Sequence, residues 1–197
     1  RSALALGEAS YQSFRNTRLG EVYVPRSQRI IYGSDIQRIA VKDYHINALP
    51  KDIVFLTAGV DTQNSGFAVE VCGWNADASR AYGIEWIWLE GDPKKPEIWH
   101  SLTNIIEQRR YKREDGKTLG VIYAAQDSGG HHTTRVYAYS LRHPRHLSVK
   151  GYVRVKETIP FLYNISHKKL ASTGNGQSKI KLHIVGVNSG KDLLLDM

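Results

Sequence analysis

The chain has 197 residues, of which 41% are hydrophobic and 23% charged, so it can bury one sizeable core and does not resemble a disordered segment. Its formal net charge of +8 suits a polyanionic partner. The single cysteine, Cys72, excludes an intramolecular disulfide framework, and no apolar run approaches the roughly 20 residues of a membrane helix.

The N-terminal part, residues 1–50, mixes weak signals and is predicted to be an extension that precedes the folded domain. Within it, Ala3–Phe14 and Ser34–Val41 are candidate helices. Asn16–Pro25 is predicted to be a loop with a short extended piece. Pro50 then marks the entry into the first strand, because the residue before a proline is biased toward extended backbone.

Three strands with short connections follow, and they predict an antiparallel meander. Ile53–Asp61 is apolar and rich in β-branched residues, as a central strand would be. Phe67–Trp74 alternates after a turn at residues 64–66, and Tyr82–Glu90 is rich in aromatic residues and isoleucine.

The next segment alternates helices and strands. A helix is predicted from Pro96 to about Arg110, where apolar residues recur at helical spacing. The strand Leu119–Asp127 follows and should run parallel to the first strand if this helix crosses over between them. Thr133 is a candidate N-cap for a helix through Leu141, and Leu147–Val149 is a short fifth strand.

This order of elements matches an α/β fold of the ribonuclease-H-like type, with a mixed sheet of a meander plus parallel strands and with flanking helices. The C-terminal part fits the pattern less well. Val153–Ile165 is predicted to form strands of a hairpin, Ser172–Ser178 a flexible loop, Ile180–Val187 a strand and Lys191–Met197 a helix.

Two acidic residues stand where a metal-dependent nuclease would need them. Asp61 and Asp127 each end an apolar strand, and adjacent parallel strands would bring both carboxylates to one edge of the sheet. Few carboxylates, completed by water and phosphate, are typical ligands of Mg²⁺, and such sites cleave phosphodiesters. The alternative for either residue alone is an ordinary turn or cap role. Glu70 and Glu85, on the second and third strands, could also approach the metal, but they are predicted to face solvent or to pair with a basic residue.

The residues after Asp127 are candidate accessory groups. Ser128, Gly129 and Gly130 would let the backbone approach a metal or phosphate closely, although a plain tight turn would explain the glycines equally well. His131 and His132 could reach a phosphate or the leaving group, or could be loop residues only.

Positive charge is concentrated in one region. Residues 128–185 contain ten Lys or Arg and a single acid, Glu157. This asymmetry favours contacts with a phosphate backbone, with a solvated basic surface as the alternative. The candidate DNA-backbone contacts are Arg142, Arg145, Lys150, Arg154, Lys156, Lys168 and Lys169. No base-reading element accompanies them, so binding is expected to be independent of sequence.

Several short segments, in this order along nearly the whole chain, resemble the nuclease region of the large terminase subunit of tailed, lambda-like phages. The matching pieces are Phe14–Glu21, Leu56–Gln63, Gly73-Trp74, Glu90–Pro93, Asp127–Gly130 with Thr133–Tyr139, Lys150-Gly151, and Val185-Gly186 with Lys191-Asp192.

The resemblance implies a metal-dependent endonuclease, encoded by a phage or prophage, that cuts concatemeric double-stranded DNA during packaging in the host cytoplasm. Asp61 and Asp127 would hold one or two Mg²⁺ or Mn²⁺ ions. The implied partners are a small terminase subunit, a portal protein and an upstream ATPase domain, whose G-x-x-x-x-G-K-[ST] loop is not in this chain. A third acidic ligand is implied on a helix that we do not find before Met197, so residues 51–197 are expected to be a nuclease domain truncated at its C-terminus.

Two other interpretations remain open at this stage. The chain could be a non-catalytic DNA-binding or assembly fragment of the packaging motor. It could also be another ribonuclease-H-like enzyme, such as a transposase or resolvase. Metal-dependent nicking separates the first from the nuclease, and a preference for specific ends or branched DNA would mark the second.

Overall fold

The computed structural model of the chain describes residues 14–19, 44–130, 132–153, 159–170 and 178–196. The chain divides into two compact units, 1–41 with 191–197 and 42–190, and each is described by itself. In the first unit, Arg15–Leu19 forms a short π-helical turn, η2. The loop predicted from Asn16 is therefore wrong as far as Leu19, where neither glycine nor proline interrupts the backbone. The candidate helix Ser34–Val41 lies outside the described residues, as does Ala3–Phe14 except for its last residue.

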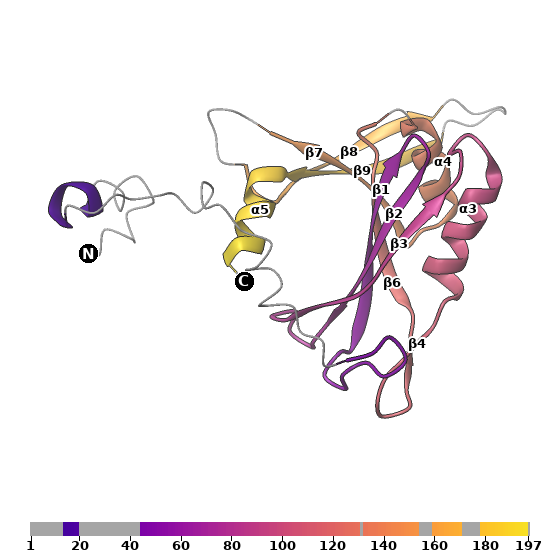
Figure 1. Cartoon of the computed structure of the whole chain (residues 1–197). Coiled ribbons are helices and arrows are strands. Elements are labelled where there is room, and N and C mark those ends of the chain that lie inside the picture. Colours follow the sequence, from indigo (N-terminus) through magenta and orange to yellow (C-terminus); the bar gives the residue numbers. More distant parts are fainter. Residues whose placement is uncertain (1–13, 20–43, 131, 154–158, 171–177, 197) are drawn as a thin grey trace. The chain divides into compact units, whose positions relative to one another are not determined.

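A seven-stranded mixed sheet forms the second unit, in the order β3-β2-β1-β6-β7-β9-β8 (Figure 1). The antiparallel pairs are β1–β2, β2–β3 and β8–β9, and the parallel pairs are β1–β6, β6–β7 and β7–β9. The strands are β1 Phe55–Gln63, β2 Gly66–Trp74, β3 Ala81–Glu90, β6 Val121–Asp127, β7 His146–Tyr152, β8 Leu162–Leu170 and β9 Ser178–Gly186. The predicted meander and the parallel partner of the first strand are confirmed, and the fold is an α/β fold consistent with the ribonuclease-H-like type.

Two helices cover one face of this sheet (Figure 1). They are α3, Pro96–Thr103, which a π-helical turn η4 extends over Asn104–Gln108, and α4, Thr133–Arg142. A third helix, α5, spans Val187–Asp196. No helix among the described residues is long and apolar enough to cross a membrane.

The core lies between the sheet and α3 and α4. Alternate residues of β1, including Leu56 and Val60, are buried there, together with Leu102 of α3 and Val136 of α4. Since successive strand residues point to opposite sides, the residues between them face away from these helices. We call the side of the sheet opposite α3 and α4 the open face.

A small hairpin closes the end of the sheet at which β1 begins. Its strands are β4, Tyr111–Lys112, and β5, Thr118–Leu119, around a turn at residues 114–116. The buried Arg113 guanidinium donates to the carbonyl of Ile53 at 2.9 Å and also binds Asp115. Leu49, in the region predicted as an extension, is fully buried and its backbone pairs with this hairpin.

The C-terminal part departs from prediction in three places. The hairpin is formed by β8 and β9, not within Val153–Ile165. Because β8 is an edge strand, it carries few buried residues and lacks the apolar signal of a central strand. The fifth strand extends from His146 to Tyr152, and α5 begins at Val187, earlier than predicted. The loop predicted at Ser172–Ser178 lies outside the described residues, except that Ser178 begins β9.

Candidate functional site

Asp61 and Asp127 lie at the ends of two neighbouring parallel strands. The β1–β6 pairing ends at Val60 and Gln126, so the two acids are the next residues along, on strands about 4.8 Å apart. Val60 and Gln126 are buried, and alternation therefore places both acids on the open face. The structure brings together the two carboxylates that the sequence singled out.

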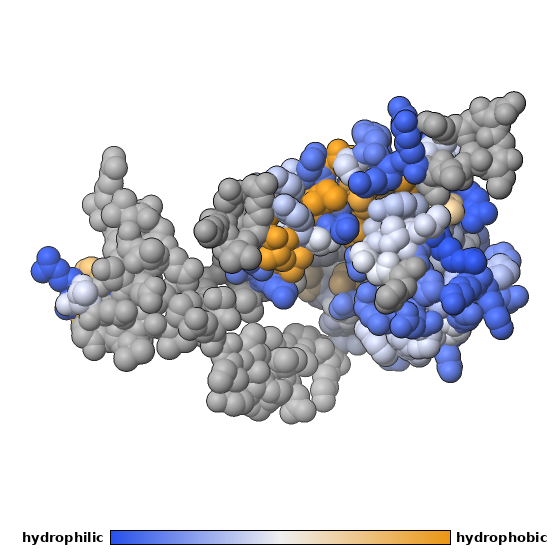
Figure 2. Space-filling model, turned by 90° about the horizontal axis from the view of Figure 1, so that it is seen from above, coloured by the Kyte–Doolittle hydropathy of each residue, from blue (hydrophilic) through white to orange (hydrophobic). Residues whose placement is uncertain are grey.

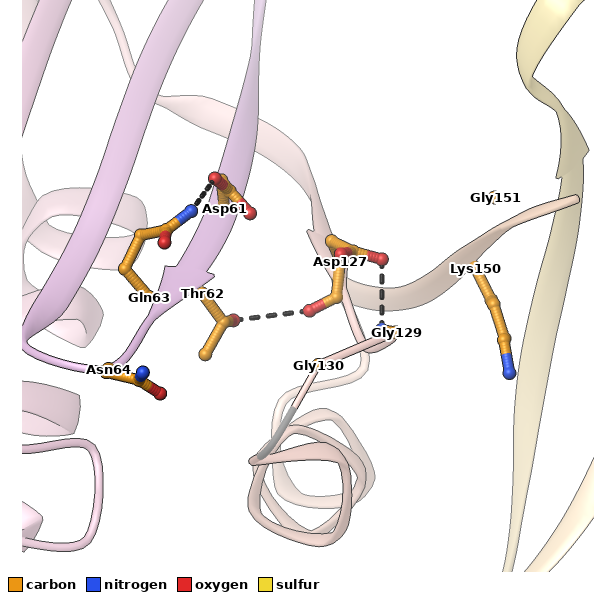
Figure 3. A pocket seen from close by; sticks show the side chains of 9 residues that line it. All are labelled: Asp61, Thr62, Gln63, Asn64, Asp127, Gly129, Gly130, Lys150 and Gly151. Atoms are coloured by element: carbon orange, nitrogen blue, oxygen red, sulfur yellow. Dashed lines mark hydrogen bonds between the residues drawn. The ribbon is translucent and has the colours of Figure 1, made fainter.

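A pocket of about 540 Å³ surrounds these two acids (Figure 3). Asp61 accepts a 2.5 Å hydrogen bond from the side-chain amide of Gln63, and Asp127 accepts one of 3.0 Å from the backbone of Gly129. The lining residues are Asp61, Thr62, Gln63, Asn64, Asp127, Gly129, Gly130, Lys150 and Gly151. Sequence reasoning missed Thr62, Gln63 and Asn64, although their place directly after Asp61 could have indicated them.

The loop after Asp127 is held firmly. Ser128 is buried, and both its backbone amide and its hydroxyl donate to the carbonyl of Val149, at 2.9 and 2.8 Å. Thr133 donates to the carbonyls of Ser128 and Gly130 at 2.6 and 2.7 Å. A Cβ at Gly129 would lie 3.3 Å from Oδ1 of Asp127, so a side chain there would crowd the carboxylate. The absence of a side chain at residue 129 therefore lets the loop backbone lie close to the Asp127 carboxylate.

The start of α4 differs from the prediction. The N-cap is His132, and Thr133 is the first helical residue because its hydroxyl reaches back to the loop carbonyls instead of capping the helix. Among the described residues, no side chain caps the first amides of α4. His131, the other histidine proposed as an accessory group, lies outside the described residues.

The oxygen atoms of this pocket fit a hard divalent cation. Two carboxylates with the nearby side-chain amide oxygens of Gln63 and Asn64 suit Mg²⁺ or Mn²⁺, with water and substrate phosphate completing the ligands. The described residues contain no group of three His, Cys, Asp or Glu that could hold a metal. Glu85 is paired at 2.7 Å with Arg109, and Glu70 is exposed beside Gly59 on the open face. Among the described residues, a metal site at this pocket would therefore rest on Asp61 and Asp127.

A chain of buried polar groups lies beneath the two acids. Gln126 donates through Nε2 to the Thr62 hydroxyl at 2.9 Å, and its Oε1 lies 2.7 Å from Nε2 of His146. The Thr62 hydroxyl in turn donates to the carbonyl of Asp127 at 3.2 Å. Burial, with a smaller contribution from nearby His143, lowers the pKa of His146 to about 3, so its imidazole is neutral at neutral pH.

This depressed pKa predicts that His146 makes the protein less stable in acid. Between about pH 6.5 and 3 the unfolded chain binds a proton at residue 146 that the folded chain does not, so the free energy of unfolding falls as pH falls. The slope from this group approaches about 1.4 kcal/mol per pH unit. His146→Gln should reduce the difference between the free energies of unfolding measured in urea at pH 6.5 and at pH 4.5. Equal pH dependence of the two proteins would contradict the prediction.

The predicted basic contacts do not all converge on the pocket. Lys150 lines it. Arg142 is the last residue of α4 and Arg145 lies in the turn before β7, so both are near the end of the sheet at which β7 begins, opposite to the pocket. Lys168 pairs with buried Ile180 and so lies on the helix-covered side. Arg154 and Lys156 lie outside the described residues.

A second basic group lies on the open face itself. Asp127 pairs with Val149, Val149 with His183, and His183 with Ile165, and paired residues point to the same side of a sheet. Alternation then places four more cationic or titratable side chains of β8 and β9 on the open face: His167, Lys169, Lys179 and Lys181. Lys179 and Lys181 were missed as contacts; the alternating Lys-Ile-Lys-Leu pattern indicates only that both lysines lie on the exposed side of a strand.

Figure 2 shows the molecule from above, relative to Figure 1. On this side the surface of the described residues is largely hydrophilic, with hydrophobic residues in a few patches. β1 and β6 end toward this side. A polar or charged ligand therefore suits this end of the sheet better than an apolar one.

Comparison with known proteins gives a consistent picture. The family model described as terminase large subunit gpA, endonuclease domain, matches residues 5–197. The terminase large subunit of Enterobacteria phage P21 is 28% identical over 176 residues, which cover 85% of this chain and 26% of that protein. The terminase large subunit of Escherichia phage lambda is 25% identical over 178 residues, covering 87% and 27%. The chain thus spans about a quarter of the length of these relatives. No solved structure matches it.

Proposed function

Because the chain belongs to the terminase large subunit gpA endonuclease domain family, we propose that it is a metal-dependent endonuclease that cuts double-stranded DNA. The observation that carries this proposal is the placement of Asp61 and Asp127 at adjacent parallel strand ends, on one face and in one pocket. The oxygen-rich lining of this pocket suits phosphodiester hydrolysis. The lining residues include no thiol and no nucleophile paired with a base, as a covalent mechanism would need.

Asp61 and Asp127 would hold Mg²⁺ or Mn²⁺ through their carboxylates. The bound metal would supply an activated water and stabilise the leaving oxygen in an in-line displacement. Gln63 and the Gly129 amide orient the carboxylates through the hydrogen bonds that each already makes. Lys150, which lines the same pocket, attracts the phosphates next to the cleaved bond.

The DNA backbone lies along the open face, away from α3 and α4. This placement rests on the shared orientation of Asp127 with His183, and through them with Lys169, Lys179 and Lys181. Lys181 lies on the second strand from that of Asp127, a separation of about 10 Å across the sheet. It is two residues from His183, the residue level with Asp127, which adds about 7 Å along the strand. Backbone phosphates of a duplex held at the metal site lie within such a reach. Contacts of this kind give affinity without sequence preference.

In its biological setting, the activity proposed here is the cutting of concatemeric phage DNA during packaging in the bacterial host cytoplasm. Site choice would come from a small terminase subunit, because the described residues present no base-reading element. A portal protein and an ATPase domain of the same polypeptide are the other proposed partners. These assignments rest on the family and on relatives that are about four times as long as this chain.

Cleavage of supercoiled plasmid tests the proposal. With Mn²⁺ or Mg²⁺ the chain should produce nicked and linear DNA, and EDTA should stop the reaction until excess metal is added back. The same preparation should bind Mn²⁺ by calorimetry. DNA binding without Mn²⁺ binding or cleavage would instead favour a non-catalytic binding role, and cleavage restricted to branched DNA would favour a resolvase-like enzyme.

A further inference from the structure

Gln126 is the most completely buried polar side chain next to the two acids. Its exposed fraction is 0%, and it immediately precedes Asp127 in β6. Because strand residues alternate, its side chain points to the helix-covered side while that of Asp127 points to the open face. A buried amide is costly unless its hydrogen bonds are satisfied, and here both ends of the amide are bonded.

The hydrogen bonds around Gln126 have one consistent direction. The Thr62 hydroxyl donates to the Asp127 carbonyl, so it can accept from Nε2 of Gln126. Oε1 of Gln126 is then an acceptor, which requires the proton of His146 to be on Nε2. Nδ1 of His146 consequently carries a lone pair, and among the described residues that buried atom has no hydrogen-bond partner. The hydrogen bonds therefore run in one direction. His146 of β7 donates to Gln126 of β6, Gln126 donates to Thr62 of β1, and Thr62 donates to the carbonyl of Asp127 in β6.

This chain of hydrogen bonds begins where the backbone ladder between β1 and β6 ends. The last paired residues are Val60 and Gln126. Each carboxylate bonds within its own segment, Asp61 to Gln63 and Asp127 to Gly129, and in the described part of the chain neither carboxylate forms a hydrogen bond to the other strand. Beyond the ladder, the connection between the two strand ends passes through Thr62, with Gln126 Nε2 and the Asp127 carbonyl as its partners.

We propose that Gln126 is a positioning residue that, through Thr62, sets the separation of the Asp61 and Asp127 carboxylates for a divalent cation. His146 fixes which way the amide of Gln126 faces. The inference rests on the proposed function, since it gives a metal-binding role to a residue that touches neither metal nor DNA. Outer groups that orient ligands in this way change metal affinity about 10- to 100-fold when removed.

Mn²⁺ affinity, measured by calorimetry alongside the free energy of unfolding in urea, tests the inference. Gln126→Met removes both hydrogen bonds at similar volume, and Thr62→Val removes the hydroxyl with little change of shape. Both should weaken Mn²⁺ binding at least about 10-fold. Thr62→Ser, which keeps the hydroxyl, should retain the affinity. Plasmid cleavage by the variants should require correspondingly more Mn²⁺ to reach half its maximal rate.

Ser140→Ala is the matched control. It breaks a buried 2.8 Å hydrogen bond to Ser148 between α4 and β7, away from the carboxylates, and should lower stability without changing Mn²⁺ affinity. Unchanged affinity in Thr62→Val would overturn the inference, and this half-buried position keeps the test available should Gln126→Met fail to fold. Equal weakening by Ser140→Ala would also overturn it. If Asp61→Asn leaves Mn²⁺ binding intact, the proposed function itself fails.

Discussion

Asp61→Asn and Asp127→Asn should each reduce metal-dependent plasmid cleavage on the order of 10³-fold, because each removes one of the two negative charges that hold the cation. The amide has the shape of the acid, so the strand ends and the loop after Asp127 should keep their structure. Asparagine at 61 can still bond with Gln63, and asparagine at 127 can still accept from Gly129. The loss should therefore appear in cleavage and Mn²⁺ affinity, not in folding.

DNA affinity separates this expectation from a general defect. Removing a carboxylate from the pocket should leave binding of a duplex in EDTA unchanged or slightly tighter, since one repulsive charge is gone. Asp77→Asn, an equivalent change in the exposed turn between β2 and β3, serves as the control and should cleave normally. Normal cleavage by Asp61→Asn or Asp127→Asn would contradict the assignment of the metal site.

The central strands could be predicted because their burial follows from local composition. β1 and β6 are apolar runs between turn residues, and both end at the acids identified from the sequence. Their adjacency followed from the helix between them, since a crossover connection makes parallel neighbours. β8 could not be placed in this way, because an edge strand exposes most of its residues and its partner β9 is chosen by tertiary pairing.

The candidate site was predictable only where its residues are neighbours in sequence. Asp127 and Gly129 lie in one segment, so the turn and the carboxylate were found together. Thr62, Gln126 and His146 come from three strands, and nothing in the flanking residues of any one of them indicates the other two. The same limit explains the basic residues: Arg142 and Lys181 look equally suitable in the sequence, but only the register of the sheet puts Lys181 on the face that carries Asp127.

The double charge reversal Lys179→Glu with Lys181→Glu should weaken duplex DNA binding roughly 10- to 100-fold near 0.1 M salt. Both side chains are exposed on the open face, so the change places two acids where the proposal puts backbone phosphates. Loss of two phosphate contacts should also reduce the slope of log affinity against log salt by about 1.8. Fluorescence anisotropy over a salt series in EDTA measures both quantities without cleavage.

A control with the same change in net charge distinguishes a located contact from overall electrostatics. Lys112→Glu with Lys117→Glu reverses two exposed charges in the β4–β5 hairpin, at the end of the sheet where β1 begins. That pair should lower affinity only slightly and leave the salt slope near that of the parent, because long-range effects are screened beyond about 10 Å at 0.1 M salt. If both pairs weaken binding equally, the open face is not the DNA track and net charge alone accounts for the affinity. If Arg142→Glu weakens binding more than the Lys179 and Lys181 pair, the DNA lies on the α4 side instead.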